Sequence, residues 1–161
     1  MTHAIRYVKG DATAPEGDGA KIIVHVCNDI GGWGAGFVVA LSKRWREPER
    51  AYRAWFREGE SNGFRLGATQ LVQVQPELWV ANIIGQRDIK RGGKGAAPVR
   101  YDAIREGLAS VRQRAVELSA SVHMPRIGCG LAGGDWSIVS AIIDEELCAH
   151  EINVTVYDLA R

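Results

Sequence analysis

The stretch KIIVHVC at residues 21–27 constrains the fold of this chain more than any other segment. It is an almost unbroken apolar run that is rich in β-branched residues. A strand with one face in water alternates polar and apolar residues, whereas a continuous apolar strand has to be covered on both faces. The run therefore predicts a strand in the middle of a sheet that has helices on both sides.

Segments with strand character alternate along the chain with segments of helical spacing. The predicted strands span residues 4–9, 21–27, 68–74, 78–84, 121–127 and 153–159, and the predicted helices span 37–45, 47–58, 99–119 and 136–150. Residues 75–77 form a turn that joins two of the strands in a hairpin. This order predicts an α/β fold, a three-layer α/β/α sandwich with a mixed, mostly parallel central sheet of about six strands. With 161 residues, we expect one domain over residues 1–161.

Composition removes several classes of function. The chain has 20 Lys and Arg against 19 Asp and Glu, so no overall field favours nucleic acid or a membrane. Cys27, Cys129 and Cys148 are odd in number and lack CxxC spacing, which favours a reducing cytoplasm over a secreted disulfide scaffold. The histidines lack the spacing of metal motifs, so we expect no metal. We also expect no cofactor. The expectation is a cytoplasmic monomer that does not associate with membranes.

Three glycine-rich segments follow predicted strands, at residues 28–36, 85–95 and 128–134. Ligands of open, mostly parallel sheets bind beyond the carboxyl ends of the strands, so we expect these segments to converge. The third, GCGLAGG, has four glycines in seven residues. Such density requires either special backbone angles or a ligand that lies close to the main chain.

Residues 128–133 match the GxGxxG pattern of dinucleotide-binding folds. That pattern normally opens a domain, whereas only one helix and one strand follow it here, and no acidic residue stands about twenty positions later at a strand end. We therefore interpret the segment as a diphosphate loop, in which small residues expose N–H groups and the helix after Asp135 adds positive partial charge. A tight turn without a ligand is the alternative.

Four segments, taken together, resemble the macrodomain family, an α/β/α module that binds ADP-ribose. They are VKGDAT (8–13), VHVCNDIGGWGAGF (24–37), MPRIGCGLAGGDW (124–136) and VTVYD (154–158), and their order and spacing are similar to the family's. The resemblance covers essentially the whole chain. MPRIGCGL is most similar to the branch of the terminal ADP-ribose protein glycohydrolase and its bacterial and phage relatives that process ADP-ribose 1″-phosphate.

The resemblance implies a position for each part of ADP-ribose. The Asp11 carboxylate would accept from the adenine amino group, the Ala12 N–H would meet the same ring, and Tyr157 would pack nearby. Asn28 would face the distal ribose. The implied contacts to the distal ribose and diphosphate are Gly32, Trp33, Gly34, Ala35, Gly36 and Phe37 in the first loop, and Gly128, Cys129, Gly130, Leu131, Ala132, Gly133 and Gly134 in the second.

The resemblance also implies that this chain lacks two catalytic residues of the glycohydrolase branch. In the glycohydrolase branch a lysine after the middle strand forms a covalent link to the sugar, and an aspartate after GCGL resolves it. This chain has Gln86 and Ala132 at those positions, so we do not expect a lysine-linked intermediate. Lys90 and Lys94, a few residues after Gln86, are the weaker alternative for such a link. We expect Asp135 to orient water towards the anomeric carbon, with the diphosphate and Asn28 fixing the sugar, and Gln86 is a further candidate catalytic residue. Asp29 is a second candidate carboxylate.

Each candidate has a structural alternative. Asp135 could only cap the following helix, Asp29 could be a solvated turn residue, and Asn28 could satisfy the backbone of its loop.

Other side chains offer weaker candidates. Cys129 could be a nucleophile with His25 or His123 as base, although a buried cysteine usually only fills space. Arg87, next to the strand end, is expected near the ligand, whereas the rest of the basic loop is expected to be solvated.

We therefore expect a metal-independent hydrolase that binds ADP-ribose and cleaves an ADP-ribosyl linkage at the distal ribose. The linkage would be an ADP-ribosyl-Glu/Asp ester, an O-acyl-ADP-ribose or ADP-ribose 1″-phosphate. The expected partner is ADP-ribose or a protein ADP-ribosylated on Glu or Asp; ADP-ribosylated nucleic acid is less favoured because no motif for reading it is present. The alternative is a non-catalytic reader of ADP-ribose, since the usual lysine and aspartate are missing.

Overall fold

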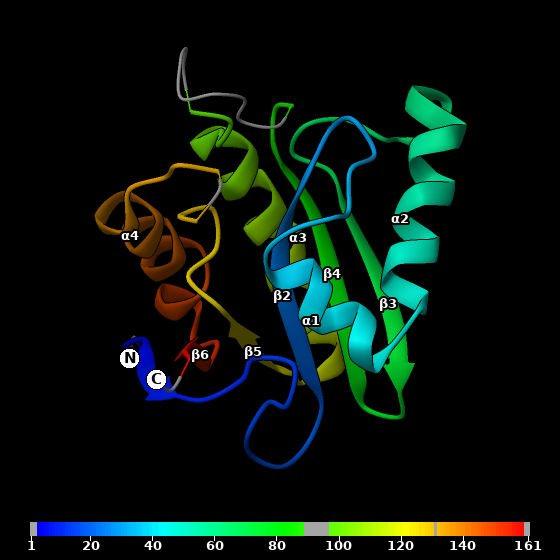
Figure 1. Ribbon diagram of the computed structural model, residues 1–161. Helices are drawn as coiled ribbons and strands as arrows, with labels where there is room; N and C mark the ends of the chain where they lie inside the picture. Colours follow the sequence, from blue (N-terminus) through cyan, green and yellow to red (C-terminus); the bar gives the residue numbers. More distant parts are fainter. Residues whose placement is uncertain (1–2, 89–96, 131, 160–161) are drawn as a thin grey trace.

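A six-stranded sheet forms the centre of the computed structural model, which describes residues 3–88, 97–130 and 132–159 (Figure 1). The strands are β1 (Arg6–Lys9), β2 (Lys21–Asn28), β3 (Thr69–Gln75), β4 (Leu78–Gln86), β5 (Ser121–Met124) and β6 (Val154–Asp158). They lie in the order β1-β6-β5-β2-β4-β3, and of the described pairs β3 with β4 alone is antiparallel. The prediction of a mixed, mostly parallel sheet is confirmed.

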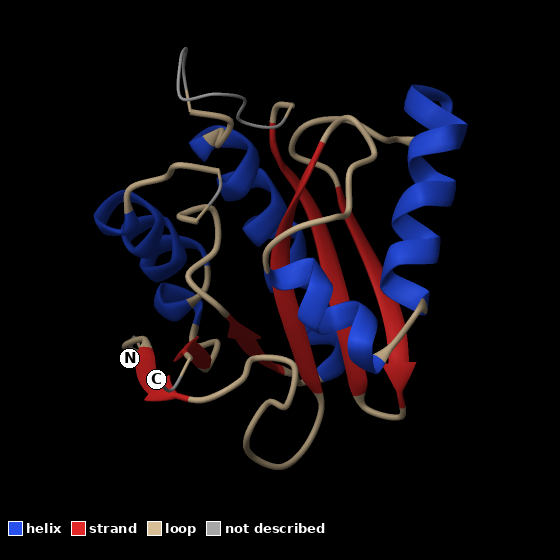
Figure 2. Cartoon of the chain, viewed as in Figure 1, coloured by secondary structure: helices blue, strands red, loops and turns tan. Residues whose placement is uncertain are grey.

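Helices cover both faces of this sheet, as Figure 2 shows with the strands in red between helices in blue. The helices α1 (Phe37–Arg44) and α2 (Glu47–Glu58) pack on one face, and α3 (Tyr101–Leu118) and α4 (Trp136–Glu146) pack on the other. Short 3-10 turns, η1 (Gly59–Asn62) and η2 (Cys148–His150), follow α2 and α4. The predicted three-layer α/β/α arrangement is therefore confirmed.

The strand β2 has the two-sided burial that its sequence predicts. Ile22 and Val24 belong to the apolar cluster under α3 and α4, whereas Ile23 and Cys27 belong to the cluster under α1 and α2. Successive side chains of a strand point to opposite faces, so both clusters depend on this one strand. Complete burial of each large aliphatic side chain stabilises the fold by about 1.5–3 kcal/mol.

Some predicted boundaries were wrong near the glycine-rich segments. The strand predicted for residues 121–127 ends at Met124, because Pro125 has no N–H to continue the ladder. The helix predicted for residues 99–119 begins at Tyr101, since Val99 forms an isolated bridge with Gln86 instead. These changes bring residues 97–100 and 125–128 to the carboxyl edge of the sheet as loops.

The contact between α3 and β4 can be tested at Gly107, where an added Cβ would overlap the buried Ile83 side chain. We expect Gly107→Ala to destabilise the fold by about 1–3 kcal/mol, although alanine favours helix more than glycine does. Urea denaturation would measure the difference. The control is Gln113→Ala on the exposed side of the same helix, for which a change within about 0.5 kcal/mol is expected. A Gly107→Ala variant as stable as the parent would contradict the packing.

Candidate functional site

Two adjoining cavities, of about 200 Å³ and 100 Å³, lie at the carboxyl ends of β2, β4 and β5, and together they are called the cleft here. The cleft is lined by residues 25–28, 32–38 and 125–128, together with Gln86, Gly130 and Ala132. The first and third glycine-rich segments therefore converge as predicted. Of the second, Gln86 reaches the cleft, whereas residues 89–96, with Lys90, Arg91 and Lys94, lie outside the described residues.

The first loop is shaped by the side chain of Asn28, which is 8% exposed. Its Oδ1 accepts from the N–H groups of Ile30 (3.0 Å) and Gly32 (2.9 Å) and from the Tyr52 hydroxyl (2.8 Å). Its Nδ2 donates to the Gly32 carbonyl at 2.9 Å. The N–H groups of Ile30 and Gly32 already occupy both lone pairs of Oδ1, and the single Tyr52 hydroxyl hydrogen is shared with the Asn28 carbonyl, 2.6 Å away. These bonds show that Asn28 supports its loop, which is its structural alternative, and its predicted contact with the distal ribose stays a prediction.

The same loop is anchored to α1 by Trp33. The Trp33 side chain is buried, and its Nε1 donates to the Ser42 hydroxyl of α1 at 2.8 Å. At the start of α1, Gly36 has a positive φ of 83° and provides no side-chain cap. The first N–H groups of the helix lack intrahelical partners, and because Gly36, Phe37 and Val38 line the cleft, these donors lie at its edge.

The glycines of the second loop divide into two kinds. Gly128 and Gly133 have φ of 73° and 75°, a region that side chains disfavour, and the Gly134 N–H donates to the Gly128 carbonyl at 2.7 Å. A Cβ at Gly134 would overlap that carbonyl, whereas a Cβ at Gly130 would meet no atom of the described residues within 4 Å. Three of the glycines are thus required by the turn itself, and Gly130 alone of the four leaves space that a ligand could use. Leu131 lies outside the described residues.

Gln86, the last residue of β4, lines both cavities and lies opposite Asn28 in the sheet register. Its Nε2 donates to the Asp88 carbonyl at 2.9 Å. Asp29 connects the two loops, because its Oδ1 accepts from the Asp88 N–H at 2.7 Å. Arg87 is exposed, and with Asp29 it lines a neighbouring depression beside the cleft.

Asp135 lies at the N-terminus of α4 and is not among the residues that line the cleft. Its Oδ1 accepts from the N–H of Ser137 (2.9 Å) and from the Ser137 hydroxyl (2.7 Å), and these bonds lower the pKa of the carboxyl. A carboxylate with a lowered pKa is a weak base. The structure therefore favours helix capping, the structural alternative for Asp135, over the predicted role in orienting water.

The residues expected at the adenine are held by local contacts. Asp11 Oδ1 accepts from the Thr13 N–H (2.8 Å) and hydroxyl (2.7 Å), and Arg44 of α1 lies 3.7 Å from its other oxygen. Burial raises the pKa of Asp11, but these contacts together outweigh it and lower the pKa. The neighbouring Ala12 is buried. The contact of Asp11 and Ala12 with an adenine stays a prediction.

Tyr157 is buried beneath the same segment. Its hydroxyl accepts from the Glu16 N–H at 2.9 Å and lies 2.7 Å from Nδ1 of His123. The His123 Nε2 lies 2.7 Å from the Ser121 hydroxyl. Tyr157 thus ties the loop after β1 to β5, and its predicted packing against adenine is untested.

The surroundings of the cysteines do not support a mechanism in which a thiol is the nucleophile. Burial raises the pKa of the Cys27 thiol and of the Cys129 thiol, so both favour the unreactive protonated form. His123 is bonded to Ser121 and Tyr157, and Nε2 of His25 lies 3.8 Å from the sulfur of the buried Cys27.

Arg126 is a cleft residue to which the sequence analysis assigned no role. Its guanidinium lies 5.2 Å from the ring centre of Tyr7 and 5.1 Å from that of Trp136, and it forms two hydrogen bonds with Asp158. The four residues come from separate parts of the chain. The only feature of the sequence that drew attention to Arg126 was its place in the MPRI segment. That segment does not reveal that Arg126 contacts Tyr7, Trp136 and Asp158.

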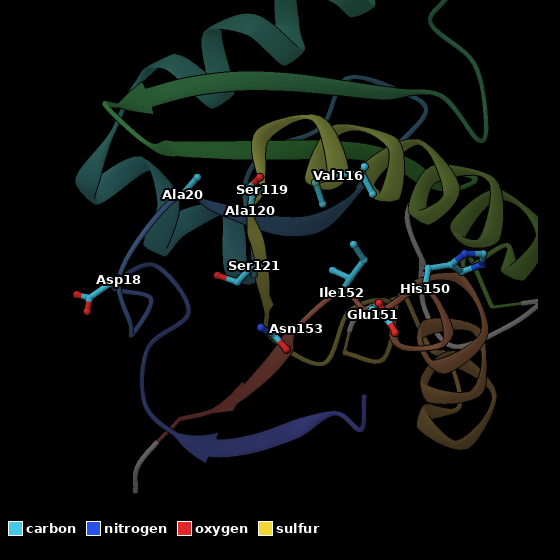
Figure 3. A pocket seen from close by; sticks show the side chains of 11 residues that line it. Asp18, Ala20, Val116, Ser119, Ala120, Ser121, His150, Glu151, Ile152 and Asn153 are labelled. Atoms are coloured by element: carbon cyan, nitrogen blue, oxygen red, sulfur yellow. The ribbon is translucent and has the colours of Figure 1, made fainter. Parts of the chain in front are cut away.

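A depression of about 430 Å³ lies at the opposite edge, near the amino ends of β2 and β5 (Figure 3). Its lining includes Ser119 at the C-terminus of α3, where the helix dipole is negative and disfavours an anion. Among the described residues no cluster of His, Cys, Asp or Glu could hold a metal ion. Within the same residues, no helix has the length and apolar character needed to cross a membrane.

No family model matches the sequence. Among the curated relatives, the chromodomain-helicase-DNA-binding protein 1-like of Danio rerio is 33% identical over 98% of this chain, which spans only 16% of that relative's length. The ADP-ribose glycohydrolase OARD1 of Bos taurus is 28% identical, over 96% of this chain and 91% of the relative. An ADP-ribose 1″-phosphate phosphatase of Lodderomyces elongisporus is 23% identical, over 96% of this chain and 99% of the relative.

Two solved structures are more similar. A protein of unknown function from Bacteroides thetaiotaomicron is 59% identical, with a TM-score of 0.92 over 96% of this chain and 98% of that one. A macrodomain protein from Streptomyces coelicolor is 57% identical, with a TM-score of 0.85 over 97% of this chain and 99% of that one. Because this identity extends over nearly the full length of both chains, the present chain belongs to the macrodomain family.

Proposed function

We propose that this chain binds ADP-ribose in the cleft and hydrolyses a linkage at its distal ribose. The observation that carries the binding proposal is that the N-terminus of α1 and the glycine loop at Gly130 line one cavity. N–H donors from two segments and the positive end of a helix suit a diphosphate. Among the described residues of the cleft, Arg126 is the charged one and is paired with Asp158, and no Asp or Glu lines the cleft to repel an anion.

The hydrolysis proposal is supported by the relatives named as an ADP-ribose glycohydrolase and as an ADP-ribose 1″-phosphate phosphatase. The substrates we propose are ADP-ribosyl-Glu/Asp esters, O-acyl-ADP-ribose and ADP-ribose 1″-phosphate. Gln86 stands where the two cavities meet, and its Oε1 has no hydrogen-bond partner among the described residues. That oxygen would accept from a water or a sugar hydroxyl, so its contribution would be orientation and not proton removal.

A non-catalytic reader of ADP-ribose or ADP-ribosylated proteins is the second candidate. The observation that favours it is the absence of carboxylate and lysine side chains among the described residues that line the cleft. Those groups are the usual sources of a general base or a covalent link. The monomeric state and the cytoplasmic location stay proposals in either case.

Calorimetry tests the binding proposal. We expect ADP-ribose to bind one to one, and Asp11→Ala to weaken binding by about tenfold, as the loss of a charged hydrogen bond would. Asp18→Ala, which removes an exposed carboxylate from the same segment, is the control and should bind as the parent does. No binding at high micromolar ADP-ribose would refute the proposed function.

Release of ADP-ribose from a protein modified on glutamate tests hydrolysis. We expect release that is faster than the spontaneous reaction, unchanged by a chelator and slowed by Gln86→Ala. Binding without any acceleration over the protein-free control would leave the reader as the function.

The open space at Gly130 gives a sharper test of the binding mode. Gly130→Ala should leave the urea midpoint unchanged, since its Cβ meets no atom of the part of the chain that the structure describes, and should weaken ADP-ribose binding by about tenfold through overlap with the ligand. Gly134→Ala should instead lower the stability, because its Cβ overlaps the Gly128 carbonyl. Unaltered affinity in a folded Gly130→Ala variant would place the ligand elsewhere.

Asp135 is expected to matter for stability alone. Asp135→Ala should lower the urea midpoint through loss of the helix cap, and Asp135→Ser should largely restore it. Because the folded-state pKa is lowered, this contribution is present above the unfolded pKa of the carboxyl and is lost as the pH falls through the folded pKa. The hydrolysis rate of the folded Asp135→Ala variant should equal that of the parent. A large loss of rate would return Asp135 to the candidate catalytic residues.

A further inference from the structure

His25 of β2 lines the larger cavity of the cleft and is 2% exposed. Its Nδ1 is the only buried side-chain nitrogen or oxygen, among the residues that the structure describes, without a hydrogen-bond partner. Buried polar atoms are nearly always paired, because leaving one unpaired costs free energy. An unpaired atom in a residue that lines a ligand cleft suggests that the partner arrives with the ligand.

The hydrogen-bond network behind His25 fixes which ring nitrogen carries the proton. Gln70 Nε2 donates to the Ala51 carbonyl, so Gln70 Oε1 faces Asn82 and accepts from its Nδ2 at 3.0 Å. Asn82 Nδ2 also donates to the Pro48 carbonyl at 3.1 Å. Asn82 Oδ1 is therefore the atom that faces Nε2 of His25, at 2.5 Å, and it can only accept. The proton has to be on Nε2, which leaves Nδ1 as a bare acceptor.

The surroundings also keep the ring neutral and fixed. Burial lowers the pKa of His25 to about 4, so the imidazole is uncharged at neutral pH. The Trp33 ring packs edge-on against it at 5.3 Å between centres, and the Phe37 ring lies at 5.9 Å. Both aromatic residues also line the cleft. A rigid, neutral acceptor pairs with a neutral donor and gives nothing to a phosphate oxygen, which has only lone pairs at that pH.

We propose that Nδ1 of His25 accepts a hydrogen bond from a hydroxyl of the terminal ribose of the bound ligand. The inference rests on the proposed ADP-ribose function and adds the residue that distinguishes ADP-ribose from ADP. The adenine amino group, another donor, is expected at Asp11, which lies beside Arg44 at the C-terminal end of α1. A ligand without the terminal sugar would leave Nδ1 unpaired, and sites built to pair a hydroxyl discriminate against ligands that lack it.

Two substitutions separate the ring nitrogens, because an amide oxygen or nitrogen can replace each one. His25→Gln retains a donor near the Nε2 position for Asn82 but loses the Nδ1 acceptor. His25→Asn retains an acceptor near Nδ1 and loses the bond to Asn82. We expect His25→Gln to weaken ADP-ribose binding by about fivefold more than ADP binding. His25→Asn should retain the parent ratio of the two affinities, even though the loss of the bond to Asn82 lowers its stability.

Calorimetry with both ligands on the whole chain measures this ratio, which cancels any general loss of folded protein. If the parent binds neither ligand, the proposed function fails and the inference fails with it. If the parent binds ADP-ribose and His25→Gln weakens both ligands equally, the inference alone is overturned. If the preference for ADP-ribose over ADP falls in His25→Asn and not in His25→Gln, the inference alone is again overturned.

Nitrogen-15 NMR of histidine-labelled protein supplies a readout that does not depend on substitution. We expect His25, assigned by the missing signals of His25→Gln, to be the Nε2–H tautomer with an Nδ1 resonance typical of an unbonded nitrogen. Saturation with ADP-ribose should move that resonance towards the hydrogen-bonded range, and saturation with ADP should not. A resonance already in the bonded range without ligand, and unmoved by ADP-ribose, would indicate a buried water and would overturn the proposal.

Discussion

The burial of β2 on both faces is the constraint from which the position of the site follows. Helices occupy both sides of the sheet, so a ligand can reach the centre of the molecule only at an edge. At the carboxyl edge the strands β2, β4 and β5 end side by side, and the chain leaves them as loops. The cleft therefore lies where the chain has to change direction, and its glycines serve the turns as well as the ligand.

The sequence predicted the architecture because the spacing of apolar residues indicates which faces of a strand or helix are buried. The buried faces in turn determine how sheet and helices stack in layers. A continuous apolar run at residues 21–27 and amphipathic spacing at residues 99–119 leave few arrangements of sheet and helix. Boundaries were less accurate where one residue changed the outcome, as Pro125 did by ending β5 early. The convergence of the loops followed from the parallel order of the strands and needed no knowledge of side-chain contacts.

The roles of individual site residues were harder to predict because they depend on partners far away in the sequence. Asn28 could be a ligand contact or a loop support, and only its bonds to Tyr52 and Gly32 favour the second. Likewise Asp135 followed the pattern of a catalytic carboxylate as well as that of a helix cap. The orientation of His25 depends on Asn82 and Gln70, and no local pattern encodes such a network.

The hydrogen bond between Tyr52 and Asn28 has a consequence for how fast a ligand binds and how much conformational entropy is lost when it does. Tyr52 belongs to the apolar cluster under α1 and α2, so the loop that it holds is ordered by the folding of the whole layer and before any ligand arrives. A preformed wall loses little conformational entropy when a ligand binds against it. Recognition at this side of the cleft should resemble docking onto a rigid surface, with association limited by the encounter and not by loop closure.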